Sequence, residues 1–319
     1  MPKPRSLLVT RRDFLRLSAP ALGAGVLGFR PWINLRRRKK GITIGMFTDS
    51  HYADREPVGS RYYRDSAAKL AAFVCTMNKA KPSFAIMLGD FIDKAETLEV
   101  ELGYLERIRN IYRQFKGKCY YVIGNHDVAT FSKEQFIRGT GMPAAHYSFD
   151  RGSFHFIVLD ANYNKDFSPY KAGNFVWTET YIPPAEQAWL EVDLARTKKP
   201  TVVFIHQRLD AEENPHGVKN APQVRKILQD SGRVIAVFQG HDHAGAYRRI
   251  AGIPYVTLRA MVEGPGLENN AYALVSISKE GSITSRGFAK QPDHVLQQPS
   301  AAEPIPAASA TGRLRLVAR

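Results

Sequence analysis

Cysteine is scarce in this 319-residue sequence, which contains only Cys75 and Cys119. Two cysteines cannot form the set of cross-links that stabilises small disulfide-rich proteins, so that class is excluded. Cys75 falls within a predicted helix and Cys119 begins a predicted strand, and we expect both to be buried small apolar residues. The composition, with 44% hydrophobic and 24% charged residues, also excludes a fibre and a mainly disordered chain.

Two other features are lacking from the sequence. The short apolar stretch at residues 18–28 is not long enough to span a bilayer as an ordinary transmembrane helix. The glycine-rich phosphate loop with the spacing Gly-x-x-x-x-Gly-Lys-Ser/Thr is also absent. Neither an ordinary transmembrane helix at residues 18–28 nor a nucleotide-loop enzyme is therefore expected.

Positive charge is plentiful, but it is unevenly distributed. The formal net charge is +15, from 45 Lys and Arg residues against 30 Asp and Glu residues. Residues 1–40 carry +10 of this excess and residues 290–319 carry +2, which leaves only +3 for residues 41–289. Because contacts to nucleic-acid phosphates need a basic surface, we expect no nucleic-acid partner for the nearly neutral central part.

The first forty residues have the organisation of a targeting segment. Arg11 and Arg12 are followed by Asp-Phe-Leu and then by the apolar stretch of small residues. This pattern resembles a bacterial twin-arginine export signal, which the export machinery reads as an address. The basic run at 36–40 and the lack of a clear Ala-x-Ala cleavage site also fit an uncleaved membrane anchor. We expect an exported bacterial protein that is periplasmic or membrane-associated.

Apolar strands and amphipathic helices alternate from residue 41 to about residue 290. Such a pattern, with short antiparallel-looking strands in its last part, predicts a single α/β domain with two packed sheets flanked by helices. Residues 291–319 are rich in Pro and Ala and are expected to be a flexible tail. The predicted strands are 42–47, 84–88, 120–123, 154–159, 201–205, 234–238, 246–250, 254–258, 271–278 and 282–288, and the predicted helices are 61–80, 95–115, 185–197 and 221–231.

Histidines gather at the ends of the predicted strands. Of the nine in the chain, five directly follow an apolar strand and stand beside Asp, Asn or Gly: His51, His126, His206, His241 and His243. The carboxyl ends of neighbouring strands in an α/β protein converge on one crevice. Imidazole, carboxylate and amide groups at the same place predict a metal site.

The carboxylates in these motifs favour two metal ions. Two cations about 3.5–4 Å apart need a bridging carboxylate to offset their repulsion. Asp90 is the candidate bridge, because it follows a strand that ends in glycine. The glycines before Asp90, Asn125 and His241 are expected to let the backbone turn closely beneath the metals.

In chain order the motifs are Asp49-x-His51, Gly89-Asp90-x-x-Asp93, Gly124-Asn125-His126-Asp127, His206 and Gly240-His241-Asp242-His243. This ordered set resembles the calcineurin-like metallophosphoesterase superfamily over nearly all of residues 41–290. The resemblance implies a four-layer α-β-β-α sandwich of two mixed sheets. It implies that one metal is bound by Asp49, His51, Asp90 and His243. The second metal would be bound by Asp90, Asn125, His206 and His241.

The same resemblance implies the chemistry. His126 matches the catalytic histidine that hydrogen-bonds the scissile phosphate or protonates the leaving oxygen. Asp127 and Asp93 match positions that orient these groups, and Asp127 is grouped with His126 as catalytic. A hydroxide that bridges the two cations would attack phosphorus in line, while the metals and His126 stabilise the charge on the phosphoryl oxygens.

The metal and the substrate class rest on a looser resemblance. Purple acid phosphatases, one branch of the superfamily, have a tyrosine where this chain has Asp93, so an iron–tyrosinate site is not expected. Residues 61–66, 81–82 and 256–258, together with Gly245, look like the manganese-dependent ADP-ribose/CDP-alcohol diphosphatase branch. This implies Mn²⁺, with Fe or Zn as alternatives. It also implies a phosphodiester or pyrophosphate substrate derived from a nucleoside diphosphate.

Substrate contacts are expected from loops that follow the ligand-bearing strands. The candidates are Arg64, Asn162, Tyr163 and Arg208, with Tyr52 and Arg55 as further ones, although each taken alone could simply pack or face solvent. His155 is expected to be packed within its strand. His146, His216 and His294 have no strand-end context and are expected to be surface histidines.

Three other functions remain open from sequence. A phosphomonoesterase of the acid or alkaline type, a cyclic-nucleotide phosphodiesterase or a nuclease would use the same site. The low charge of residues 41–289 argues against a long nucleic-acid substrate. A non-catalytic scaffold with this fold is disfavoured, because every expected ligand position and His126 are present.

Overall fold

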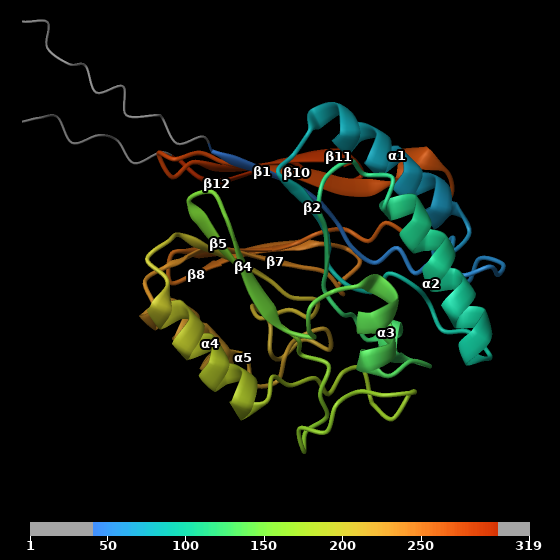
Figure 1. Cartoon of the computed structure of the whole chain (residues 1–319), viewed down its shortest axis with the longest axis horizontal. Helices are drawn as coiled ribbons and strands as arrows, with labels where there is room; N and C mark the ends of the chain where they lie inside the picture. Colours follow the sequence, from blue (N-terminus) through green and yellow to red (C-terminus); the bar gives the residue numbers. More distant parts are fainter. Residues whose placement is uncertain (1–40, 299–319) are drawn as a thin grey trace, which may run out of the picture. The chain divides into compact units, whose positions relative to one another are not determined.

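The computed structural model describes residues 41–298, and all structural statements concern this part of the chain (Figure 1). The export signal and basic run expected in residues 1–40 lie outside it, and so do residues 299–319 of the expected tail. Among the helices of residues 41–298, none is long and apolar enough to cross a membrane.

Two six-stranded sheets form the centre of the domain. The first has the strand order β12-β11-β10-β1-β2-β3, in which β1, β2 and β3 are parallel and β10 runs antiparallel to β1. The run of apolar residues in β1 is almost completely buried, as expected for a central strand covered on both faces. Its strands are β1 (Ile42–Phe47), β2 (Phe84–Met87), β3 (Cys119–Tyr121), β10 (Ala271–Ile277), β11 (Ile283–Ala289) and β12 (His294–Gln297).

The second sheet has the order β4-β5-β6-β7-β9-β8. Its four central strands are parallel, and β4 and β8 pair antiparallel at its two edges. Its strands are β4 (Tyr147–Arg151), β5 (Phe154–Val158), β6 (Thr201–Phe204), β7 (Val234–Gln239), β8 (Ala246–Ile250) and β9 (Ile253–Thr257). The two sheets are therefore both mixed, as predicted.

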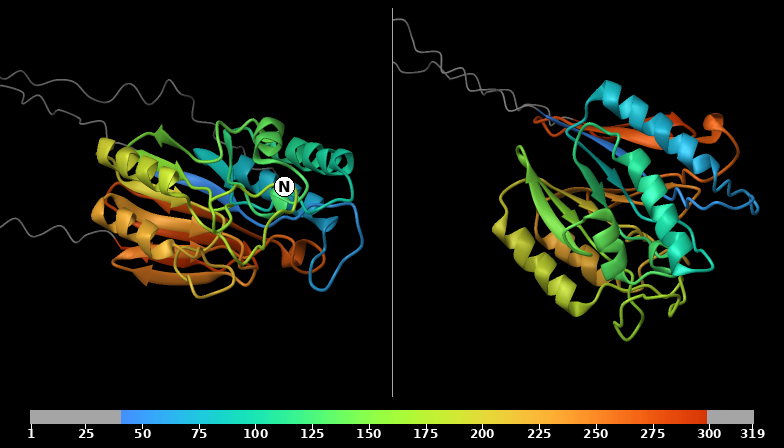
Figure 2. Two further views of the ribbon diagram at one scale, coloured as in Figure 1. Left: turned by 90° about the horizontal axis from the view of Figure 1, so that it is seen from below. Right: turned by 45° about the vertical axis from the view of Figure 1, so that its right-hand side comes forward.

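Helices cover the outer faces of both sheets (Figures 1 and 2). Helices α1 (Asp65–Ala80) and α2 (Leu98–Tyr112) lie on the side of the first sheet, where Met77 of α1 packs beneath Gly45 of β1. Helices α4 (Pro184–Arg196) and α5 (Ala221–Asp230) lie on the side of the second sheet. The predicted α-β-β-α sandwich is confirmed.

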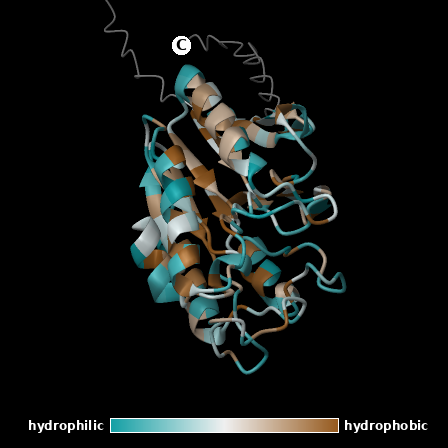
Figure 3. Cartoon of the chain, turned by 90° about the vertical axis from the view of Figure 1, so that its right-hand side faces the viewer, coloured by the Kyte–Doolittle hydropathy of each residue, from teal (hydrophilic) through white to brown (hydrophobic). Residues whose placement is uncertain are grey.

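The core between the sheets is aromatic. The ring of Phe84 in β2 lies 5.0 Å from that of Phe156 in β5, and edge-to-face contacts of this kind favour close packing. A separate apolar cluster joins α4 and α5 to the second sheet through Leu190 of α4, Leu228 of α5 and Val203 of β6. Coloured by hydropathy, the strands are mostly apolar, whereas the outer helices mix hydrophilic and hydrophobic residues (Figure 3).

Several short elements were not predicted from the sequence. Helix α3 (Lys133–Thr140) was not predicted, although Ser132 and Gln135 form a reciprocal capping box at its start. Strand β4 was also missed, although its residues Tyr-Ser-Phe-Asp alternate between apolar and polar.

Two expectations are wrong. The folded part does not end at residue 290, because β12 pairs with β11 and Leu296 is fully buried. The predicted tail therefore begins several residues too early. Cys75 is exposed on α1 and Cys119 is only half-buried, whereas both were expected in the core. The helical pattern around Cys75 places its neighbours Phe73 and Val74 inward instead.

Candidate metal centre

Seven polar side chains meet where the strands of the two sheets end. Those of the first sheet follow β1, β2 and β3, and those of the second sheet follow β6 and β7. Six of the seven are buried and the seventh, His243, is partly exposed. They are Asp49, His51, Asp90, Asn125, His206, His241 and His243.

The first group of ligand atoms comes from Asp49, His51 and His243. The Nε2 atoms of the two histidines are 3.1 Å apart, and each lies 3.6 Å from Oδ1 of Asp49. These atoms face one another closely enough to bind a single ion between them.

The second group consists of Asp90, His206 and His241. Oδ2 of Asp90 lies 3.2 Å from Nε2 of His206 and 3.4 Å from Nε2 of His51. The Asp90 carboxylate thus stands between the two groups, where a carboxylate that bridges two cations is needed.

Several of these atoms have no hydrogen-bond partner among residues 41–298, although some of them lie within ion-pair distance of other groups of the cluster. Oδ1 of Asp49, Oδ1 of Asn125 and the Nε2 atoms of His206 and His241 are buried and accept or donate no hydrogen bond. Buried polar atoms without a partner are costly, so four in one place require an explanation. Oxygen and imidazole donors of this kind fit divalent cations such as Mn²⁺, Fe²⁺ and Zn²⁺.

The backbone at the site is held in an unusual conformation. Asp49, His51, Asp90 and His241 all have positive φ, between 42° and 69°, which costs free energy for residues other than glycine. Gly89, next to Asp90, has φ of 100°, and a Cβ atom there would lie 2.3 Å from the ring of His206. The expected close turns beneath the metals are confirmed at Gly89.

Hydrogen bonds fix which nitrogen each histidine presents. Nδ1–H of His206 donates to the carbonyl oxygen of Leu88 at 2.8 Å. Nδ1–H of His243 donates to Oε1 of Glu263 at 2.6 Å. Both rings therefore leave Nε2 available as a ligand atom.

Glu263 was not identified from the sequence. It follows β9 by several residues and has no motif around it, so only the fold brings it to His243. The loop that carries it is held by the buried Lys69, whose Nζ donates to the carbonyl oxygens of Met261, Glu263 and Gly264 at 2.7–2.9 Å.

Charges within the cluster shift the pKa values in opposite directions. Burial opposes ionisation of Asp90, but the His206 and His126 imidazoles hold its pKa well below the usual range. Burial acts to lower the pKa of His51, yet the Asp90 and Asp49 carboxylates raise it to about 10. Burial lowers the pKa of His241, which favours the neutral form that binds metal.

His126 lies beside this cluster and reaches the solvent-facing side. Its Nδ1–H donates to Oδ1 of Asp93 at 2.9 Å, and its backbone N–H donates to Oδ1 of Asp90 at 2.8 Å. Oδ2 of Asp93 also lies 3.4 Å from Nδ1 of His51. Asp93 thus contacts both a ligand candidate and His126, and the orienting role implied for it stays a prediction.

The Asp127 side chain is fully buried, whereas a catalytic group must reach the substrate. Its carboxylate accepts hydrogen bonds from the backbone N–H groups of Gly124, Phe91 and Ile92 at 2.8–3.2 Å. Burial raises its pKa to about 8, and the negative charge of Asp90 adds to this effect. In this position Asp127 ties the loop after β2 to the loop after β3, and a catalytic role for it stays a prediction.

A cavity of about 590 Å³ opens over the metal cluster. Asp90, Asn125, His126, His241 and His243 form part of its wall. The remaining lining residues are Ser60, Arg61, Trp177, His216, Asp242, Ala244 and Glu263.

The four expected substrate contacts are not among the described residues that line this cavity, and their role in binding substrate stays a prediction. Arg64 forms ion pairs with Asp54 and Glu56 at the surface. Arg208 is buried and paired with Asp210 and Asp242.

The asparagine and the tyrosine of that set are held in the same way. The Asn162 amide is fully buried and donates to Ile123 and Asp160. The ring of Tyr163 lies beneath Nζ of Lys133 at 3.3 Å. Local partners satisfy these groups, and none of these partners is visible as a pattern in the sequence.

The two further candidates are also occupied by neighbours. Tyr52 is buried with its ring edge against Tyr104. Arg55 lies over the ring of Tyr63 and pairs with Asp93 at 3.1 Å.

Three of the remaining histidines have identifiable neighbours. His155 is packed and hydrogen-bonded to Asp150 and Asp193, as predicted. His146 is not a free surface residue, because it lies 3.1 Å from the buried Glu186. His294 stacks on Tyr247.

The expectation for His216 is wrong. It lies in the cavity wall with its ring 5.1 Å from that of His241. Trp177 was missed altogether, because it lies in a long irregular segment between β5 and α4 that offers no periodic signal.

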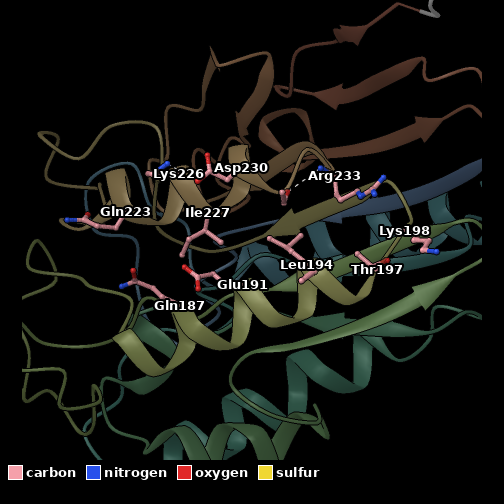
Figure 4. A pocket seen from close by; sticks show the side chains of 12 residues that line it. Gln187, Glu191, Leu194, Thr197, Lys198, Gln223, Lys226, Ile227, Asp230 and Arg233 are labelled. Carbon is pink, nitrogen blue, oxygen red and sulfur yellow. Dashed lines mark hydrogen bonds and ion pairs between the residues drawn. The ribbon is translucent and has the colours of Figure 1, made fainter.

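A second cavity, of about 650 Å³, lies between α4 and α5 (Figure 4). Its wall is formed by helix side chains such as Gln187, Glu191 and Lys226, and Lys226 forms an ion pair with Asp230. None of the described metal-ligand groups contributes to it. The chemistry therefore belongs to the smaller cavity at the strand ends.

Similar proteins were found by sequence and by structure. The family model for calcineurin-like phosphoesterases matches residues 42–245. The manganese-dependent ADP-ribose/CDP-alcohol diphosphatase of Xenopus tropicalis is 25% identical, over 78% of this chain and 92% of the relative. The protein of the same name from Oryza sativa subsp. japonica is 25% identical, over 73% of this chain and 87% of the relative.

Among solved structures, a dimetal phosphatase from Danio rerio has a TM-score of 0.70 and 20% identity, over 81% of this chain and 99% of that chain. This likeness shows a shared fold of two sheets and flanking helices. The family match covers all the strand ends that carry the clustered ligand candidates. The chain therefore belongs to the calcineurin-like phosphoesterase family and is a hydrolase.

Proposed function

We propose that this protein hydrolyses a phosphodiester or pyrophosphate bond in a small nucleotide-derived substrate such as ADP-ribose or a CDP-alcohol. The observation that carries the proposal is the position of Asp90 between two groups of ligand atoms, with His126 beside them in the cavity wall. The substrate class is supported by the names of the relatives from Xenopus tropicalis and Oryza sativa.

The residues divide into two ligand sets that share Asp90. Two divalent cations at this centre would polarise the phosphoryl oxygens and supply a nucleophile from water at neutral pH. One set is Asp49, His51, Asp90 and His243, and the other is Asp90, Asn125, His206 and His241. We propose Mn²⁺ as the native ion, because both relatives are named as manganese-dependent and the donors are oxygen and nitrogen without sulfur.

His126 is the residue that handles a proton or a phosphoryl oxygen. Its Nδ1 is occupied by Asp93, so Nε2 is the nitrogen left to face a substrate. An imidazole oriented by a carboxylate can donate a hydrogen bond to the phosphoryl group or a proton to the leaving oxygen. Arg61, which also lines the cavity, adds a positive charge near this end of the site.

Hydrolysis of ADP-ribose tests the proposal. The full chain loaded with Mn²⁺ should convert ADP-ribose and water into AMP and ribose 5-phosphate, which chromatography separates. Removal of the metal with a chelator should abolish the reaction, and Mn²⁺ should restore it. Bis-p-nitrophenyl phosphate serves as a parallel diester substrate.

Other reaction products would indicate one of the alternative enzyme functions. Turnover of the artificial diester alone would keep the phosphoesterase activity but contradict the nucleoside-diphosphate substrate. Release of inorganic phosphate from AMP would indicate a phosphomonoesterase. Conversion of a cyclic nucleotide to its monophosphate would indicate a cyclic-nucleotide phosphodiesterase.

We also propose that residues 1–40 direct export through the twin-arginine machinery, to the periplasm or to a membrane-associated location. The proposal is supported by the Arg11-Arg12 pair, the apolar stretch behind it and the concentration of positive charge in this segment. That route carries folded proteins, which suits an enzyme that acquires its metals before export.

Replacement of both arginines by lysine, Arg11→Lys with Arg12→Lys, should prevent export in a bacterial host, because the receptor reads the pair itself and not only its charge. Cell fractionation and immunoblotting measure the distribution. Arg36→Lys with Arg37→Lys is the matched control, since it makes the same chemical change in the same segment and should leave export intact. Unchanged export of the Arg11 and Arg12 variant would contradict the proposal.

A further inference from the structure

Trp177 is an exposed aromatic residue at the wall of the metal cavity. Its side chain is 42% exposed, and it is the one large apolar side chain among the described residues that line the cavity. The indole ring lies 5.5 Å from the ring of His241 and 5.3 Å from that of His216. The side chain therefore stands directly beside one of the ligand candidates, with a face still open to solvent.

The turn that carries Trp177 is fixed by hydrogen bonds. The backbone N–H of Glu179 donates to the carbonyl oxygen of Val176 at 2.9 Å and closes the turn. The hydroxyl group of the buried Tyr170 lies within hydrogen-bond distance of the carbonyl oxygens of Val176 and Glu179, on both sides of Trp177. Because these contacts order the backbone, the indole is presented in advance of any ligand.

His216 is held beside Trp177 by a second set of contacts. The backbone N–H of Arg208 donates to the carbonyl oxygen of His216, and the Arg208 guanidinium pairs with Asp242 between His241 and His243. Lys219 N–H donates to the carbonyl oxygen of Thr180, which joins the loop of His216 to the segment of Trp177. The two rings thus belong to one supported wall.

An exposed indole on a fixed turn contributes little to the core of the fold. Apart from the small Ala244, its neighbours in the cavity are charged or polar, so the chemistry that it adds is a flat apolar surface next to a centre for phosphate. Nucleobases stack on aromatic side chains, and each stacked base contributes about 1–3 kcal/mol. A nucleotide has both required parts, because a sugar joins its planar base to its phosphate.

We propose that Trp177, supported by His216, forms a stacking site for the base of a nucleotide whose phosphate group lies at the metal centre. This proposal rests on the proposed function only in placing the phosphate at the metals. It assigns base recognition to the wall formed by Trp177 and His216, in place of the expected contacts at Arg64, Asn162, Tyr163 and Arg208.

Binding of two matched ligands tests the stacking site. AMP and ribose 5-phosphate carry the same 5′-phosphate on ribose, but only AMP has a base. Calorimetry with the Mn²⁺-loaded full chain should show tighter binding of AMP. Trp177→Ala should weaken AMP binding about tenfold and leave ribose 5-phosphate binding unchanged, while Trp177→Phe should keep most of the affinity for AMP.

Phe167→Ala is the matched control. Phe167 is also an exposed aromatic residue in the segment between β5 and α4, with 39% exposure, but it contacts Tyr181 and lies outside the described lining of the cavity. This variant should bind both ligands like the parent protein. Thermal unfolding of each variant separates a loss of fold from a loss of contact.

The result distinguishes the stacking site from the proposed reaction. Equal binding of AMP and ribose 5-phosphate by the parent protein, no measurable AMP binding, or unchanged AMP binding by Trp177→Ala would each overturn the site. A surface for a protein partner would produce that last result. A failure to hydrolyse both ADP-ribose and the artificial diester, together with AMP binding that depends on Trp177, would overturn the proposed function and leave the stacking site in place.

Discussion

Replacement of Asp90 by asparagine is expected to reduce the bound metal from two ions to fewer than two per chain and to abolish most of the hydrolytic activity. Oδ2 of Asp90 lies 3.4 Å from the ligand nitrogen of His51 and 3.2 Å from that of His206, so it serves both ligand groups. An amide has no negative charge to offset the repulsion between two cations. The expected loss in kcat/KM exceeds the roughly 10²–10³-fold that follows removal of one stabilising donor.

Asp90→Asn is expected to disturb the local structure less than Asp90→Ala does. Oδ1 of Asp90 accepts the backbone N–H of His126, and an asparagine side-chain oxygen can accept the same bond. Asp90→Ala removes this bond as well and should show the same metal loss with lower thermal stability. Metal analysis after dialysis and thermal unfolding measure the two effects. Two tightly bound ions per chain in both variants would show that Asp90 is not the bridge.

The ligand candidates could be found from the sequence because they follow strands directly. In a parallel sheet the residue after a strand has little freedom of position, so Asp49, Asp90 and His206 are placed by the strands themselves. The positive φ values of Asp49 and Asp90 were not predictable, because no glycine marks these positions. Only the neighbouring Gly89 gave a local sign of the close turn.

The residues of the cavity wall could not be found in the same way. Glu263, Trp177 and His216 lie in loops far apart in the chain, and their positions depend on tertiary contacts such as those of Lys69 and Tyr170. The surroundings of the expected substrate contacts depend on tertiary contacts in the same way. Arg208 lies two residues after His206, but its guanidinium forms ion pairs with the carboxylates of Asp210 and Asp242. It is not among the described residues that line the cavity. Pairing of this kind is decided by side-chain packing, which strand periodicity does not describe.

Replacement of His126 by alanine is expected to leave two metals bound and to lower kcat by about 10²–10⁴-fold. The His126 side chain belongs to neither ligand set, and its backbone N–H contact to Asp90 does not depend on the ring. The ring is 27% exposed at the cavity, with Nδ1 held by Asp93. Metal analysis and steady-state kinetics at saturating Mn²⁺ measure the two quantities, and unchanged kcat would contradict a catalytic role.

Asp93→Asn supplies the companion variant for His126. It keeps the size of the side chain but removes the carboxylate that orients Nδ1, and loss of such an orienting contact costs about 10–100-fold. Because Asp93 also lies 3.4 Å from His51, part of its effect should appear in metal affinity, whereas the effect of His126→Ala should not. A larger effect on metal binding for His126→Ala than for Asp93→Asn would place His126 among the ligands.

The dependence of kcat on the leaving group distinguishes two possible roles of His126. If Nε2 donates a proton to the leaving oxygen, the loss in kcat for His126→Ala should be smallest for p-nitrophenyl esters and should grow as the leaving alcohol becomes more basic. If Nε2 instead donates a hydrogen bond to the phosphoryl oxygens, the loss should be the same across the series, because charge develops there whichever group departs. A series of aryl phosphodiesters measured with the parent protein and the variant separates these two roles, which the position of the ring beside Asp90 and Asp93 permits equally.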